Sequence, residues 1–96
     1  MYTAPMVQIR CVVSGRVQAV AYRAYVEVSA TELEVTGYIR NLPDGTVEVV
    51  AQGDPTTLKE FVEYLHEGSL LSEVEAVAVE WESIKSNYDD FSIRHN

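Results

Sequence analysis

Residues 14–23 read Ser14-Gly15-Arg16-Val17-Gln18-Ala19-Val20-Ala21-Tyr22-Arg23, and the segments on either side of them have different periodicities. Upstream, apolar and more polar residues alternate over residues 7–13, which predicts a half-buried strand. Downstream, four apolar residues recur at helical spacing: Tyr22, Val26, Ala30 and Leu33. A loop between a strand and a helix faces the first unpaired N–H groups of the helix and the positive end of its dipole. The stretch therefore predicts an anion-binding loop.

The two arginines of this stretch place fixed positive charge at either end of the loop. Gly15 would let the backbone turn between them. Positive charge is disfavoured at the start of a helix, so Arg23 is an unusual choice for a purely structural cation. We therefore expect Arg23 to contact a bound anion. Arg16 and Arg40 are also typical of solvated surface charges, and Gln18, Tyr22 and Thr46 are expected to be structural.

The charge of the chain is strongly negative but uneven. The 96 residues carry a net charge of −8, which argues against a nucleic-acid partner. Residues 1–41 contain four arginines and three acids, whereas residues 42–96 contain three basic residues and twelve acids. No acid occurs from Met1 to Val26, so the least acidic region includes the proposed loop. This distribution favours a small anion over a polyanion.

The rest of the chain alternates between short strand and helix patterns. Strand composition over 36–42 and 46–52, separated by Pro43-Asp44-Gly45, predicts an antiparallel hairpin. Asp54 and Pro55 are typical of a helix start, and Gly68 of a helix end. Alternation over 77–82 and the short segment 91–94 predict two more strands.

This order, β-α-β-β-α-β plus a short C-terminal strand, is typical of an α+β, ferredoxin-like split βαβ sandwich. We expect residues 1–96 to form one domain, with two helices on one face of an antiparallel sheet. The N-terminus does not have the pattern of a signal peptide, and no apolar run is long enough to span a membrane. The single Cys11 lies on the apolar face of the first strand and is expected to be an inert core residue. We expect a cytoplasmic monomer.

The sequence resembles the acylphosphatase family over nearly its whole length. Residues 15–23, Gly-Arg-Val-Gln-Ala-Val-Ala-Tyr-Arg, are similar to the family's first signature, a Gly-Arg-Val-Gln-Gly-Val loop closed by an aromatic residue and an arginine. Residues 37–41, Gly-Tyr-Ile-Arg-Asn, and residues 44–47, Asp-Gly-Thr-Val, are similar to the second signature. Two separated signatures in the family's order make the resemblance specific.

The resemblance implies hydrolysis of acyl phosphates, which are carboxyl-phosphate mixed anhydrides, to a carboxylate and inorganic phosphate. It implies no cofactor and no metal, and inorganic phosphate should act as a competitive inhibitor as well as a product. By motif position, Arg23 would bind phosphate and Asn41 would orient the attacking water, while a phosphate oxygen of the substrate accepts the proton. Arg23 would act with backbone N–H groups of a phosphate-binding loop: Gly15, Arg16, Val17, Gln18, Ala19 and Val20.

Two positions depart from the family pattern, and two other functions remain open. Ala19 and Glu34 stand where the family has glycine. If position 19 takes the left-handed conformation, alanine there costs about 1 kcal/mol, and we expect the corner at Glu34 to turn through Thr36-Gly37 instead. An alternative function is a non-catalytic ferredoxin-like module that binds phosphate or an acyl-phosphate-like ligand. The presence of Asn41 favours the enzyme, because a binding module needs no water-orienting residue, and an RNA-binding module is disfavoured by the acidic charge.

Overall fold

A computed structural model describes residues 5–18 and 21–95 of the chain. Within these residues, helices and strands follow the predicted order. They are β1 (Val7–Arg16), α1 (Tyr22–Glu32), β2 (Thr36–Asn41), β3 (Val47–Gly53), α2 (Pro55–Glu67), β4 (Glu73–Glu82) and β5 (Phe91–Arg94). Ala19 and Val20, which the sequence assigns to the phosphate-binding loop, lie outside the described residues.

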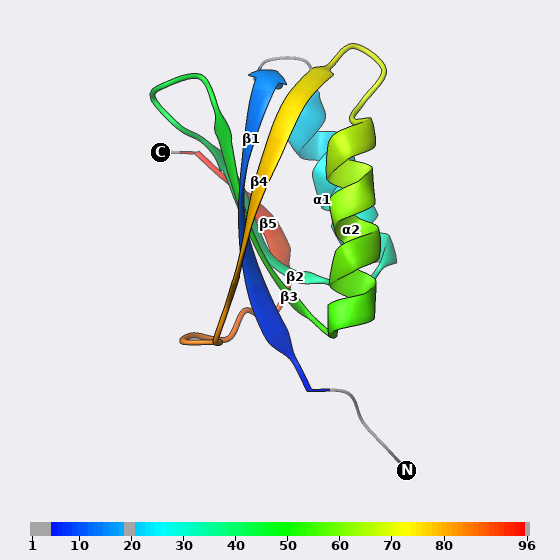
Figure 1. Cartoon of the computed structure of the whole chain (residues 1–96), viewed down its shortest axis with the longest axis vertical. Helices are drawn as coiled ribbons and strands as arrows, with labels where there is room; N and C mark the ends of the chain where they lie inside the picture. The colour runs from blue at the N-terminus through cyan, green and yellow to red at the C-terminus, as the bar shows by residue number, and fades with distance from the viewer. Residues whose placement is uncertain (1–4, 19–20, 96) are drawn as a thin grey trace.

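The strands form one sheet in the order β4-β1-β3-β2-β5, and both helices cover the same face of it (Figure 1). This arrangement confirms the predicted ferredoxin-like fold. The sheet is mixed, however, because β5 pairs parallel with β2, with Gly37 opposite Phe91 and Ile39 opposite Ile93. The prediction of an antiparallel sheet is wrong at this edge. Alternating apolar residues show which side chains face the core, but they do not show in which direction a strand runs beside its neighbour.

Apolar side chains fill the space between the sheet and the two helices. The fully buried ones include Ile9, Val13, Ile39, Val47, Val49, Tyr22, Val26, Leu58, Phe61 and Leu65. Cys11 lies in the same core, and burial raises the pKa of its thiol to about 12. A thiol with this pKa stays protonated at neutral pH and does not act as a nucleophile. The prediction that Cys11 lies in the core is confirmed.

The strand before the loop is longer than predicted. Gly15 and Arg16 belong to β1, because β4 starts earlier than expected and pairs with them through Val74 and Glu73. Gly15 has φ of 119°, and a Cβ at this position would overlap the backbone carbonyl of Glu73. Only glycine fits this crossing of the two strands. The loop proper therefore starts at Val17.

The corner after α1 turns at Glu34 itself. Glu34 adopts the left-handed conformation with φ of 58°, so the prediction that Thr36-Gly37 would supply the turn is wrong. The N–H of Val35 donates to the carbonyl of Ala30 at 2.8 Å, which closes the helix end around this residue. Gly37 has a different role, since a Cβ there would overlap the carbonyl of Val50 on β3.

Candidate active site

The loop that follows β1 is attached to the β2–β3 hairpin. Val17 is buried in the core, with 1% of its surface exposed. The side-chain Nε2 of Gln18 donates to the carbonyl oxygens of Leu42, at 3.0 Å, and Thr46, at 2.8 Å. These two hydrogen bonds set the position of the loop relative to Asn41, the last residue of β2. Gln18 is structural, as expected, and it connects the two signatures.

Arg23 and Asn41, which are far apart in the sequence, line one hollow. Its volume is about 380 Å³, and its lining residues are Arg23, Asn41, Arg94 and His95. Arg23 is the second residue of α1, so the unpaired N–H groups of the helix start lie beside its backbone. Among the described residues, the lining includes Arg23 and Arg94 and contains no Asp or Glu. The fixed positive charge of Arg23 at a helix N-terminus suits a phosphoryl group.

Asn41 presents an unused hydrogen-bond acceptor. Among the described residues, its Oδ1 is buried and has no hydrogen-bond partner. An unsatisfied buried polar atom costs about 1–3 kcal/mol, so proteins rarely retain one without a compensating function. An amide oxygen beside a cationic hollow can accept a hydrogen bond from a bound water. The geometry therefore supports the role that the resemblance implies for Asn41.

Arg94 and His95 were not predicted from the sequence as site residues. The parallel pairing of β5 with β2 brings them there, because it places Arg94 opposite Arg40, next to Asn41. The guanidinium carbon of Arg94 lies 3.7 Å from the ring centroid of Tyr38, a cation–π contact. Nδ1 of His95 lies 3.5 Å from Nη1 of Arg23. Arg94 and His95 lie beside the second signature because β5 runs parallel to β2. The alternation of apolar residues in the sequence does not indicate this direction.

Arg40, although adjacent to Asn41, forms an ion pair on the face of the sheet that the helices do not cover. Its Nε lies 2.6 Å from the carboxylate of Glu48, and Nε of Arg10 lies 2.6 Å from the same carboxylate. Burial tends to raise the pKa of Glu48, but hydrogen bonds from the two arginines outweigh this effect and lower it. Arg40 is therefore an ion-pair partner rather than a solvated charge, and it does not line the hollow.

The residue before α1 has a strained backbone. Ala21 is the N-cap of the helix, with φ of 60° and ψ of 17°, and its side chain makes no capping hydrogen bond. The left-handed region costs an alanine about 1 kcal/mol relative to glycine. Alanine is also among the poorest N-cap residues, whereas glycine is tolerated.

We expect Ala21→Gly to raise the free energy of unfolding by about 1 kcal/mol, because relief of strain and a better cap exceed the entropy that glycine adds to the unfolded chain. Urea denaturation followed by circular dichroism measures the change. The matched control is Ala24→Gly inside the same helix, which should lower stability by about 1 kcal/mol. Equal losses in both variants would show that the left-handed conformation of Ala21 carries no strain.

The described residues offer no cluster of metal ligands. Among residues 5–18 and 21–95, no group of three or more His, Cys, Asp or Glu side chains is placed to hold a metal ion. His66 lies in the last turn of α2.

Comparison with known proteins agrees with this geometry. The acylphosphatase family profile matches residues 9–93. An acylphosphatase from Methanococcoides burtonii is 45% identical over 85% of both chains, and one from Thermus thermophilus is 49% identical over 79% of this chain and 86% of its own length. The crystal structure of an acylphosphatase from Bacillus subtilis superposes with a TM-score of 0.90, at 35% identity, over 93% of this chain and 99% of that one. The chain belongs to the acylphosphatase family, whose activity is the hydrolysis of acyl phosphates.

Proposed function

We propose that this chain hydrolyses acyl phosphates with Arg23 as the phosphate-binding cation and Asn41 as the residue that orients water. The observation that carries the proposal is that both residues line one hollow, where the buried Oδ1 of Asn41 has no partner among the described residues. Backbone N–H groups of residues 15–20, the end of β1 and the loop after it, would complete the phosphate site. Arg94, whose guanidinium stacks on Tyr38, also lines the same hollow.

The chemistry requires positioning rather than a strong base. Water attacks phosphorus while the bond between phosphorus and the acyl oxygen breaks, and that oxygen leaves with the electron pair as a carboxylate. Because the leaving group is good, most of the rate enhancement comes from neutralising the phosphoryl oxygens and aligning the water. A phosphate oxygen of the substrate accepts the water's proton, so the products are a carboxylate and inorganic phosphate.

The proposal is tested by phosphate release from benzoyl phosphate in excess EDTA. We expect hydrolysis well above the spontaneous rate, because the charges that meet the phosphoryl group belong to side chains, and competitive inhibition by inorganic phosphate. Hydrolysis abolished by EDTA would contradict the metal-free mechanism. Phosphate binding without turnover would instead fit the non-catalytic binding module.

Three further properties belong to the proposal. We propose that residues 1–96 act as one domain, that the protein works in the cytoplasm, and that it is a monomer. A lone buried Cys11 suits a reducing compartment, since it takes part in no disulfide. Among the described residues, no helix has the length and apolar character needed to cross a membrane. Sedimentation velocity measures the oligomeric state.

A further inference from the structure

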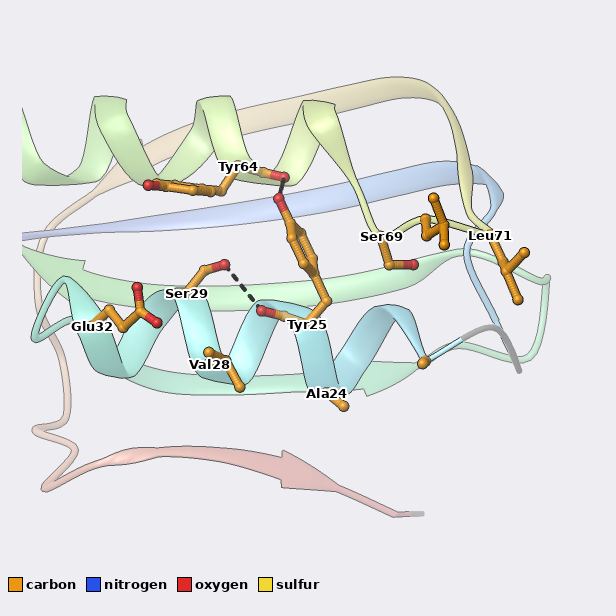
Figure 2. Close-up of a pocket in the computed structure, with 10 residues that line it drawn as sticks. Ala24, Tyr25, Val28, Ser29, Glu32, Tyr64, Ser69 and Leu71 are labelled. Carbon is orange, nitrogen blue, oxygen red and sulfur yellow. Dashed lines mark hydrogen bonds between the residues drawn. The ribbon is translucent and has the colours of Figure 1, made fainter.

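A second, larger hollow lies on the outside of the helical layer, between α1 and α2 (Figure 2). Its volume is about 620 Å³. The residues that line it are mostly small or apolar: Ala21, Ala24, Tyr25, Val28, Ser29, Glu32, Tyr64, Ser69, Leu70 and Leu71. We call this hollow the interhelical groove.

The interhelical groove is bordered by two connected helices, and its surface is apolar. The hydroxyl of Tyr25 donates to the carbonyl of Tyr64 at 2.9 Å and so connects the two helices across it (Figure 2). Three aliphatic side chains are nevertheless exposed to solvent, Val28 by 56%, Leu70 by 98% and Leu71 by 68%. Contiguous exposed apolar side chains around a concave surface are typical of a binding site.

The groove adjoins the candidate active site. A smaller hollow shares Ala21 and Ala24 with the interhelical groove, and it shares Arg23 and His95 with the hollow that contains Asn41. Among the described residues, the groove and the hollow at Asn41 have no lining residue in common. The connecting hollow at Arg23 therefore lies between them.

This order matches the geometry of an in-line displacement. The attacking water and the leaving oxygen must lie on opposite sides of phosphorus. With the phosphoryl group at Arg23 and the water at Asn41, the acyl oxygen points away from Asn41, toward Ala21 and Ala24. The acyl group would then lie where the interhelical groove begins.

We propose that the interhelical groove binds the acyl chain of the substrate, so that the preferred substrates are phosphates of apolar carboxylic acids. This inference rests on the proposed function of Arg23 and Asn41. From Ala21 to Glu32 the groove follows α1 for roughly 16 Å, which leaves room for an extended chain. Glu32 is the single charged residue among the described residues that line it, so an acyl group that ends in a carboxylate is disfavoured.

The test compares kcat/KM for acetyl phosphate and octanoyl phosphate. Each buried methylene is worth about fourfold in affinity, and partial burial of the longer chain should favour octanoyl phosphate by at least about 30-fold. Butyryl phosphate should also be a better substrate than succinyl phosphate, which has the same number of carbons but a terminal carboxylate. Equal kcat/KM values for acetyl and octanoyl phosphate would overturn the inference.

A groove variant and a matched control separate the groove from the catalytic centre. Leu71→Ser should lower kcat/KM for octanoyl phosphate about fivefold and leave acetyl phosphate within about twofold, because it removes apolar contact with the chain only. Met6→Ser, an exposed apolar residue before β1 and outside the groove, should change neither value. Equal losses for both substrates in Leu71→Ser, or a dimer that this variant dissociates, would overturn the inference. No hydrolysis of either substrate by the unmodified protein would overturn the proposed function itself.

Discussion

Replacement of Arg23 by glutamine is expected to lower kcat/KM for benzoyl phosphate about 1000-fold and to weaken inhibition by inorganic phosphate. The size follows from the loss of a preorganised charge that meets the phosphoryl group in a hollow whose described lining contains no Asp or Glu. Ground state and transition state both contact this charge, so KM should rise while kcat falls. Steady-state kinetics with phosphate as a competitor measures both effects.

The stability of Arg23→Gln distinguishes a catalytic role from a structural one. Arg23 lies in the first turn of α1, where positive charge opposes the helix dipole. Its removal should therefore leave the free energy of unfolding unchanged or raise it by about 0.5 kcal/mol. Arg23→Lys, which keeps the charge but loses the planar fork, should retain intermediate activity. A loss of activity that accompanies a loss of stability would indicate that Arg23 supports the fold rather than the reaction.

One control variant and one test of the proton acceptor complete this experiment. Lys59→Gln removes an exposed positive charge from α2, away from the hollow, and should leave kcat/KM unchanged. His95→Phe tests the proton acceptor, because His95 contributes the imidazole among the described residues that line the hollow. If a phosphate oxygen accepts the proton, His95→Phe should retain most of kcat. A loss as large as that of Arg23→Gln would assign the proton transfer to His95.

The sequence predicted the order of elements because local periodicity and turn residues agree with the final fold. Tyr22 and Val26 define the buried stripe of α1, and Asp54 caps α2 by accepting from the N–H of Thr57 at 3.0 Å. Arg23 and Asn41 could be named because their motifs are specific. These features depend on short stretches of chain, and tertiary packing did not change them.

The features that the sequence did not predict depend on contacts between distant segments. Arg94 and His95 reach the hollow only because β5 runs parallel to β2. The left-handed backbone of Glu34 and Ala21 could not be predicted, because neither residue type favours that region and the packed ends of α1 impose it. The interhelical groove likewise has no periodic signal, since Leu71 lies in a connection far in sequence from Ala21.

The second large effect is expected for Asn41→Ala, which should lower kcat about 100-fold while phosphate inhibition changes little. The reason is that Asn41 contacts the water and not the phosphoryl group in the proposed arrangement. Substrate binding in the ground state therefore survives its loss. The kcat and the phosphate inhibition constant, measured for the same preparation, report the two effects separately.

Stability provides an independent measurement, because the Oδ1 of Asn41 is buried without a partner among the described residues. Removal of an unsatisfied buried oxygen relieves a desolvation cost of about 1–3 kcal/mol, so Asn41→Ala should be at least as stable as the unmodified protein. Asn41→Asp keeps an oxygen in place but adds negative charge, and it should weaken phosphate inhibition as well as turnover. If Asn41→Ala loses phosphate inhibition as fully as Arg23→Gln, Asn41 binds the phosphoryl group and the water must be oriented by another residue. A more stable variant that turns over slowly and still binds phosphate would instead identify Asn41 as a residue retained for catalysis at the expense of stability.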